Sequence, residues 1–362
     1  MNVRLNNQIK DRFIKRLQND KQTKNAFLLV SNESLDVNVD LNYGETSFPN
    51  QAYYLASIGK VFTSVIIGRL CEKKQLYYET KVMDVLGEEL LSGLHIFKGI
   101  DYTPTITIRQ LLNHTSGIGD YFEDKPKYGE SMLDMILRNP YRSYSSIEIV
   151  KWSREHISPV FKPDTGFHYS DTGYHLLGLV IEKLLGMPLY QVMDQELFKP
   201  LNMHHTYLAS HLNNVENEEL ICDVYWENKN VKDYSIFKDD FAGGGIVTTS
   251  SDLLIFFKAL ICHEIVLEST LENMTQWSKH SSLKFFGIEY GLGLMSLKST
   301  PLLFPKKYCS FGHMGSIGSF MFYNPYSQTY ILGSLNCFNA QRKSMLIFFD
   351  ALKLVVKAFE KR

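Results

Sequence analysis

The sequence predicts an α+β fold in which a central antiparallel sheet, built from both chain ends and flanked by terminal helices, lies beside a mostly helical subdomain. Strand patterns occur near both ends of the 362 residues, each next to an amphipathic helix pattern. Helical patterns and polar loops dominate the middle. We therefore expect one catalytic domain over residues 1–362, with an α/β part at about 1–80 and 250–362 and a helical subdomain at about 81–249.

The N-terminal elements follow from hydrophobic periodicity. Apolar residues recur at helical spacing over residues 5–17 and predict an amphipathic helix. Residues 25–31 and the alternating residues 35–41 predict an antiparallel strand pair. A buried helix is predicted to begin at or just after Ser57, because the apolar side chains of residues 61–70 share one face.

The later elements are also predicted from sequence patterns. Helices are predicted at residues 106–112, 147–156 and 174–185, the last ending at a Gly-Met-Pro stop. The C-terminal part returns to strands at 319–323 and 329–335 and closes with a strongly apolar helix at 342–360.

Composition excludes several classes of partner. The chain is 44% hydrophobic with a formal net charge of −1, and its basic residues form no stripe interleaved with aromatics. We therefore expect no nucleic-acid binding. No segment approaches the ~18 continuous apolar residues of a membrane span. A small-molecule or peptide substrate is the expected partner, and the oligomeric state stays open.

The cysteine content and the N-terminal sequence indicate in which cellular compartment the protein works. The five cysteines are odd in number and contain no C-x-x-C pair, which predicts reduced, mostly buried thiols and neither disulfides nor a zinc site. The first 20 residues contain no apolar signal-peptide core. We therefore expect a cytoplasmic protein, provided that the sequence is not trimmed.

The stretch YYLASIGK at 53–60 places a serine three residues before a lysine at a predicted helix start. Ser57 and Lys60 would share one helix face, and the helix N-terminus supplies unpaired N–H groups for a developing oxyanion. A lysine with a lowered pKa can take the serine proton. Taken alone, the pattern favours a helix cap with a solvated lysine. It also occurs at Ser235–Lys238 and Ser281–Lys284, in polar surroundings.

A second stretch, FHYSDTGY at 167–174, lies just before a predicted helix. Tyr169 can serve as a base or proton relay beside a cationic lysine, and Asp171 can hold that lysine or the substrate. The alternative is that Asp171 or Thr172 caps the helix and Tyr169 packs in the core.

A third stretch, FGHMGSIGS at 311–319, leads into the penultimate strand. Glycines beside an edge strand let a substrate approach and leave N–H groups free to donate. His313 can orient a proton or a carboxylate, or can be a buried histidine with satisfied hydrogen bonds.

In this order, the three stretches resemble the S-x-x-K, Y-x-N and K-x-G or H-x-G motifs of the serine β-lactamase and penicillin-binding-protein superfamily, class C β-lactamase-like branch. That branch includes D-Ala-D-Ala carboxypeptidases, D-aminopeptidases and β-lactamase-fold esterases. Supporting stretches lie at 111–117, 161–166, 243–249 and 290–293. The resemblance covers the chain from about residue 25 onward.

The resemblance implies a role for each matched residue. Ser57 would be the acylated nucleophile, and Lys60 and Tyr169 would share the general base and acid roles. The N–H groups of Ser57 and Ser316 would form the oxyanion hole, and His313 would contact the substrate or Tyr169. No metal or cofactor is implied. The residues expected to bind substrate or to line the oxyanion hole are Asp171, His313, Gly315 and Ser316.

Asp171 departs from the family pattern, which has asparagine there. An ionised aspartate only accepts hydrogen bonds, and it would favour the charged form of Lys60. We therefore expect Tyr169 to carry more of the proton transfer and β-lactam hydrolysis to be poor or absent.

The sequence thus predicts a serine hydrolase that forms an acyl-enzyme on Ser57 and cleaves a small ester or amide. A D-Ala-D-Ala carboxypeptidase or class C-like β-lactamase is one alternative. A non-catalytic binding or sensor protein that retains the fold is another. No G-x-S-x-G elbow, Walker A loop, G-x-G-x-x-G or H-E-x-x-H motif is present.

Overall fold

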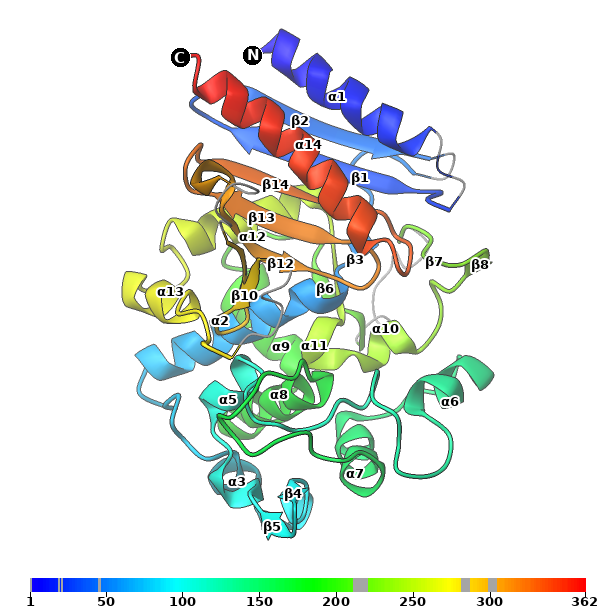
Figure 1. The fold of residues 1–362 in the computed structure, drawn as a ribbon, viewed down its shortest axis with the longest axis vertical. Helices are drawn as coiled ribbons and strands as arrows, with labels where there is room; N and C mark the ends of the chain where they lie inside the picture. The colour runs from blue at the N-terminus through cyan, green and yellow to red at the C-terminus, as the bar shows by residue number, and fades with distance from the viewer. Residues whose placement is uncertain are drawn as a thin grey trace.

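The computed structural model describes residues 2–18, 20, 22–44, 47–210, 221–280, 287–298 and 305–362. At its centre is a seven-stranded antiparallel sheet (Figure 1). In spatial order its strands are β10 (Ile288–Tyr290), β11 (Met295–Leu297), β12 (Ser310–Met314), β13 (Phe320–Asn324), β14 (Thr329–Ser334), β1 (Ala26–Asn32) and β2 (Val37–Tyr43). The first strand of the chain therefore pairs with the last one, with Leu29 opposite Leu332.

The two terminal helices, α1 (Val3–Leu17) and α14 (Gln341–Phe359), cover one face of this sheet (Figure 1). Successive side chains of a strand point to opposite faces, and β1 is buried on both. Leu28 and Val30 pack in a core with the terminal helices, whereas Phe27 and Leu29 belong to the core on the other face. A strand buried on both faces explains why residues 26–30 are continuously apolar.

Three helices contribute to the second core: α2 (Gly59–Glu72), α8 (Asp171–Leu185) and α12 (Ser250–Ile261). The rings of Phe62 in α2 and Phe256 in α12 stack with their centroids 3.6 Å apart. Because α2 is buried over nearly its whole length, the residues at its start are held rigidly.

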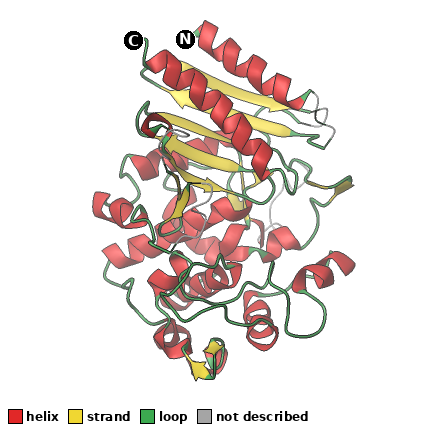
Figure 2. Cartoon of the chain, viewed as in Figure 1, coloured by secondary structure: helices red, strands yellow, loops and turns green. Residues whose placement is uncertain are grey.

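The remaining elements are short, and Figure 2 shows helix and loop dominating the part of the molecule away from the large sheet. The short helices are α3 (Val82–Leu86), α4 (Glu88–Leu91), α5 (Ile108–Leu112), α6 (Met132–Arg138), α7 (Ser146–His156), α9 (Leu189–Met193), α10 (Ile236–Asp239), α11 (Phe241–Gly244) and α13 (Glu268–Met274), with a π-helical turn at Asp194–Phe198 and 3₁₀ turns at Ala56–Ile58, Thr103–Thr105 and Lys306–Tyr308. The short strands are β3 (Tyr53–Tyr54), β6 (Tyr207–Leu208) and β9 (Ile246–Thr248), which form one sheet, and the pairs β4 (Ile96–Phe97) with β5 (Ile100–Asp101) and β7 (Tyr225–Trp226) with β8 (Lys229–Asn230).

The predicted α+β architecture, with a sheet built from both chain ends and flanked by terminal helices, is confirmed. The helix predicted at 174–185 begins three residues earlier, at Asp171, because the Ser170 side chain caps it by accepting a hydrogen bond from Gly173 N–H. The division into an α/β part and a helical subdomain at residues 81–249 stays a prediction.

The cysteine prediction is wrong in one respect. All five thiols are free, but only Cys222 and Cys337 are buried; Cys71 and Cys309 are half-buried and Cys262 is exposed.

Within the part of the chain that the structure describes, no single helix has the length and hydropathy of a membrane span. One pair, α8 with the segment Leu189–Phe198, passes such a test only jointly and is bent by 77°.

Candidate active site

Ser57 lies in the 3₁₀ turn that joins β3 to α2. The preceding residue, Ala56, has a φ of 48°, in the left-handed region that L-residues rarely adopt. The turn is fixed by a close approach of two glycines, because a Cβ on Gly59 would lie 2.8 Å from Gly244 Cα in α11. The candidate nucleophile is therefore held by a strained and tightly packed turn, as functional residues often are.

Lys60 lies one turn after Ser57 and is completely buried. Its ammonium donates to Ser57 Oγ at 3.3 Å and to the carbonyl of Gly243 at 2.9 Å. It also forms an ion pair with the carboxylate of Asp171, and it lies 4.9 Å from the ring centroid of Tyr169. The predicted Ser57, Lys60, Tyr169 and Asp171 are thus brought together.

The charge of Lys60 follows from these neighbours. Burial alone would lower the pKa of Lys60, but the negative charge of Asp171, with smaller contributions from Tyr169 and Asp240, raises this pKa well above its ordinary 10.5. Lys60 is therefore an ammonium at neutral pH. It can donate a hydrogen bond to Ser57 and stabilise negative charge, but it is not a resting-state base.

Tyr169 lies two residues before α8 and is positioned by contacts with His114. Its ring packs on His114 with the ring centroids 4.3 Å apart, and His114 Nδ1 accepts a hydrogen bond from Ser170 N–H at 3.1 Å. Tyr169 Oη is buried and makes no hydrogen bond of good geometry within the described ranges. Burial raises the pKa of Tyr169, and the nearby Lys60 ammonium opposes this rise, so the phenol is neutral at rest.

Gly315 and Ser316 lie in the turn between β12 and β13. A Cβ on Gly315 would lie 2.7 Å from the carbonyl oxygen of Leu55 and 3.0 Å from Ala56 Cβ, so only glycine lets this turn approach the Ser57 turn. Ser316 and Ser57 line the same pocket. Since the first N–H groups of a helical turn have no intrahelical acceptor, the Ser57 N–H is free of helical bonding there.

His313 lies deeper than the resemblance implies. It is fully buried and is not among the described residues that line the pocket. Its Nδ1 donates to the carbonyl of Met314 at 2.8 Å, and its Nε2 accepts from Tyr290 Oη at 2.9 Å. Burial and the Lys60 charge lower the His313 pKa to about 3. The neutral imidazole thus contacts Tyr290, whose ring meets Tyr169 edge-on with centroids 6.1 Å apart.

The pocket at Ser57 has a volume of about 60 Å³. The predicted residues on its lining are Ser57, Tyr169, Asp171 and Ser316; the others are Ala56, Tyr121, Phe122, Glu123, Ile236, Phe237, Asp240 and Phe338. Sequence reasoning missed Glu123 and Asp240. The position of Asp240, three residues before a Gly-Gly-Gly run, was the one available signal.

Asp240 lies against the same glycine as the Lys60–Asp171 pair. A Cβ on Gly243 would be 2.7 Å from Asp240 Oδ1 and 3.3 Å from Asp171 Oδ1. Burial raises the pKa of Asp240 to about 7; Lys60 lowers this pKa, and Asp171 raises it further. The carboxyl groups of Asp171 and Asp240 therefore compete for interaction with the Lys60 ammonium.

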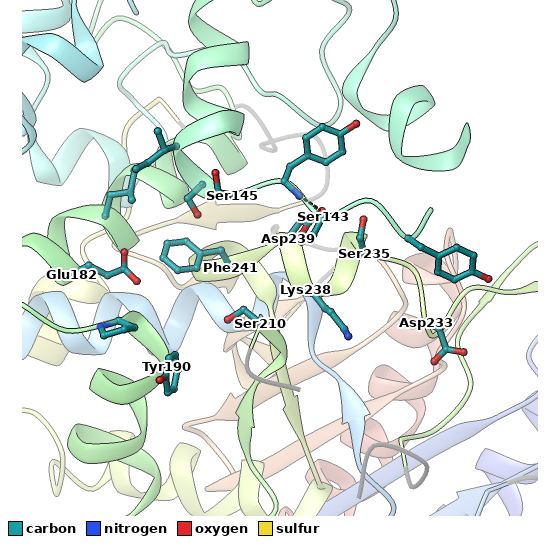
Figure 3. Close-up of a pocket in the computed structure, with 16 residues that line it drawn as sticks. Ser143, Ser145, Glu182, Tyr190, Ser210, Asp233, Ser235, Lys238, Asp239 and Phe241 are labelled. Atoms are coloured by element: carbon teal, nitrogen blue, oxygen red, sulfur yellow. Dashed lines mark hydrogen bonds between the residues drawn. The ribbon is translucent and has the colours of Figure 1, made fainter. Parts of the chain in front are cut away.

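The second S-x-x-K pattern lies elsewhere. Ser235 and Lys238 line a separate cavity of about 680 Å³, and their side chains point away from each other there (Figure 3). They do not form the contact seen between Ser57 and Lys60. The third pattern, at Ser281–Lys284, falls outside the described residues.

Known proteins resemble this chain in sequence and in fold. Penicillin-binding protein 4* of Bacillus subtilis is 29% identical over 247 residues, which cover 62% of this chain and 48% of that protein. The chain spans about half the length of this curated relative. The D-stereospecific amidohydrolase from Streptomyces sp. superposes with a TM-score of 0.75 at 24% identity, covering 94% of this chain and 97% of that one. The hydrolase EstCE1, described as having promiscuous acyltransferase activity, gives a TM-score of 0.80 at 17% identity, covering 98% and 99%.

These similarities agree with the order and geometry of the three motifs. The Beta-lactamase family model matches residues 12–348, almost the whole chain. The chain therefore belongs to the beta-lactamase family, within the serine β-lactamase and penicillin-binding-protein superfamily.

Proposed function

We propose that the protein is a serine hydrolase that cleaves small esters or amides through an acyl-enzyme on Ser57. The observation that carries the proposal is the contact of a buried lysine ammonium with the Ser57 hydroxyl, 3.3 Å away, at the base of a pocket that Tyr169 also lines. The superfamily membership and the hydrolase names of the structural neighbours support it. Expected substrates are small molecules or peptides.

In this proposal Tyr169 relays the proton during acylation. Ser57 Oγ bonds to the acyl carbon as its proton moves to Tyr169 Oη, and the proton of Tyr169 moves to the leaving group as the bond from carbon to the leaving group breaks. Neither a free phenolate nor a neutral lysine is required. This fits a Lys60 pKa well above 10.5 and a Tyr169 pKa raised by burial.

The other groups stabilise charge. The Lys60 ammonium donates to Ser57 Oγ and favours the negative charge that develops as the proton leaves. The N–H groups of Ser57 and Ser316 would receive the oxyanion of the tetrahedral intermediate. Deacylation reverses the relay: water attacks the ester carbon, its proton passes to Tyr169, and the proton of Tyr169 returns to Ser57 Oγ as the acid is released.

The test uses labelling and a matched control. After reaction with a fluorophosphonate, intact-protein and peptide mass spectra are expected to show one adduct on Ser57. The adduct should vanish in Ser57→Ala and persist in Ser235→Ala, which removes the serine of the second S-x-x-K pattern. Absence of an adduct with both a fluorophosphonate and a penicillin would favour the non-catalytic binding protein. A panel of p-nitrophenyl esters, nitrocefin and D-amino-acid anilides would then separate esterase, β-lactamase and peptidase activity.

A further inference from the structure

The two terminal helices form an outer layer of the molecule. α1 and α14 lie side by side across one face of the large sheet and run in opposite directions (Figure 1). Apolar side chains such as Ile9 and Phe348 are buried against the sheet. Exposed residues of both helices form one continuous surface, which we call the terminal-helix face: Arg4, Asp11, Arg12 and Lys15 of α1 with Arg342, Leu346, Lys353 and Lys357 of α14.

This layer is strongly basic, although the chain as a whole is nearly neutral. Together α1 and α14 contain nine lysines and arginines but only two acidic residues, a formal charge of +7. The whole chain has a formal charge of −1, so the remainder carries −8. At physiological ionic strength, charges are screened beyond about 8 Å. A surface that touches the terminal-helix face therefore meets its positive charge and little of the negative charge elsewhere.

The cations of this face are available to a partner. In α14, Arg342, Lys353 and Lys357 are separated by three turns and by one turn, so they share one side of the helix. Within the described ranges, none of these three side chains has an ion-pair partner. Asp350 is the acidic residue of α14, and it already pairs with Arg12 and with Arg16 of α1.

A groove between the two helices collects four of the cations. It has a volume of about 480 Å³, and its cationic lining consists of Arg12 and Lys15 from α1 with Lys353 and Lys357 from α14. Lysine and arginine donors that converge from two helices can bind a phosphate group from both sides.

The shape of the face argues against nucleic acid as its partner. Both helices lie flat on the sheet, so neither can enter a major groove that is about 12 Å wide. No aromatic side chain of these two fully described helices is exposed, so single-stranded bases would find no ring to stack on. The large apolar side chains that the helices do expose are Val3 and Leu346. Aliphatic groups among lysines and arginines are typical of helices that lie on a lipid surface.

We propose that the terminal-helix face docks on an anionic phospholipid surface, with lipid phosphates in the groove between α1 and α14. Because the apolar sides of both helices are buried in the protein, the docking is electrostatic and involves no insertion of a helix. None of the described residues that line the Ser57 pocket belongs to either helix. The inference is therefore independent of the proposed function, and a docked molecule keeps that pocket open.

The first experiment measures sedimentation of the full chain with lipid vesicles. Each lysine or arginine close to an anionic surface raises the binding constant about fivefold. The protein should bind vesicles that contain about 30% phosphatidylglycerol in phosphatidylcholine, and should not bind phosphatidylcholine alone. Raising the salt from about 50 mM to about 500 mM should release it. No binding at low salt, or equal binding to both vesicle types, would overturn the inference.

Charge reversal then tests the face itself. The triple variant Lys15→Glu/Lys353→Glu/Lys357→Glu should bind the anionic vesicles at least about 100-fold more weakly. The control Lys98→Glu/Lys151→Glu/Lys183→Glu changes the net charge equally, at exposed lysines outside α1 and α14, and should lose much less affinity. Equal losses in the two variants would show that only total charge matters and would contradict the proposal.

Folding and the nature of the anion are checked separately. Both triple variants should melt within about 2 °C of the native protein, since all six lysines are exposed. If the reversal unfolds the chain, the triple change of Lys15, Lys353 and Lys357 to Gln replaces it and should still weaken binding by about tenfold or more. Release from vesicles by an equal phosphate concentration of free glycerol 3-phosphate would show a site for a soluble anion and overturn the lipid assignment. Equally tight binding of a duplex oligonucleotide would overturn it as well.

Discussion

Asp171 lies where the Y-x-N motif of the resemblance has an asparagine. An asparagine would leave Lys60 with a neutral neighbour, whereas the aspartate forms a buried ion pair with it. The result is a lysine that is a charged donor to Ser57. In the proposed mechanism the proton of Ser57 therefore leaves through Tyr169, whose phenol can accept one proton and donate another.

Asp171→Asn tests this division of roles. Removing the carboxylate should lower the Lys60 pKa and destabilise the fold by about 3 kcal/mol, since one partner of a buried ion pair is lost. Acylation of Ser57 by a p-nitrophenyl ester should change in rate and should gain a dependence on Lys60 ionisation in its pH profile. Nitrocefin turnover should appear or increase. An acylation rate unchanged for both ester and β-lactam would contradict the assignment.

Asp240 predicts a pH dependence of stability. Its pKa is raised in the folded protein to about 7, from an ordinary 3.8. The folded state therefore holds the proton more tightly than the unfolded chain, so this group stabilises the fold below about pH 4 and loses that contribution as pH rises toward 7. Asp240→Asn should raise the melting temperature at pH 8, by about 3 °C or more, and raise it by a smaller amount at pH 5, where only part of the contribution is lost. A variant that melts below the native protein at pH 8 would show that the carboxylate stabilises the fold.

At the scale of elements, the turn between β12 and β13 must approach the start of α2. The approach is possible because Gly315 has no side chain, and the Ser319 hydroxyl adds a hydrogen bond to the carbonyl of Leu55 at 2.6 Å. This contact brings Ser316 to the edge of the Ser57 pocket. The proposed oxyanion hole thus depends on two elements that are distant in sequence.

Gly315→Ala is expected to separate these elements. The new methyl group would meet the backbone of Leu55, so the variant should lose about 2 kcal/mol or more of stability and acylate Ser57 more slowly. Gly173→Ala in α8 is the matched control. There a Cβ would meet only ordinary contacts, 3.6 Å from Leu111 Cδ2, so alanine should leave stability unchanged or raise it by up to about 1 kcal/mol. Denaturant midpoints and stopped-flow acylation with a p-nitrophenyl ester measure both effects.

Sequence patterns predicted those residues of the candidate site whose positions depend on local spacing along the chain. Ser57 and Lys60 come together within one helical turn, which their spacing alone predicts. Tyr169 and Asp171 lie at the start of a helix, which the local sequence also predicts. The patterns did not locate Glu123 and Asp240, because both reach the pocket through tertiary packing. Glu123 lies in a loop without a motif, and the only signal for Asp240 is the glycine run that follows it. The patterns also did not show that His313 would lie beneath the pocket, since its position depends on the hydrogen bond with Tyr290.

At the scale of the whole molecule, the two cores on either face of the sheet serve different purposes. One contains the helices that support Ser57, Lys60 and the start of α8; the other joins α1 and α14 to the sheet. Arg16 of α1 donates to the Asp350 carboxylate of α14 at 2.6 Å and links the two terminal helices. We therefore expect damage to the core that contains α1 and α14 to affect stability more than catalysis.

Phe348→Ala tests this separation. Phe348 is fully buried in α14, and its ring lies 5.1 Å from that of Phe322 in β13. Truncation should lower the free energy of unfolding by about 3 to 5 kcal/mol because it leaves a cavity. The kcat/KM per folded molecule, determined at 20 °C with active sites titrated by a fluorophosphonate, should stay within about twofold of the native value, a difference of about 0.4 kcal/mol. A tenfold loss would show that the two cores are coupled.

The pairing of β1 with β14 has a consequence for how the chain is made. These partners are separated by roughly 300 residues, so during translation β1 and β2 leave the ribosome long before the strand beside them exists. Until then one edge of β1 is open to pairing with other chains, a hazard for an apolar strand. The sheet that supports Ser57 can close only after β14 has been synthesised. Folding of the catalytic region is therefore expected to be late, and a chaperone that shields residues 26–32 in the nascent chain would raise the yield of active protein.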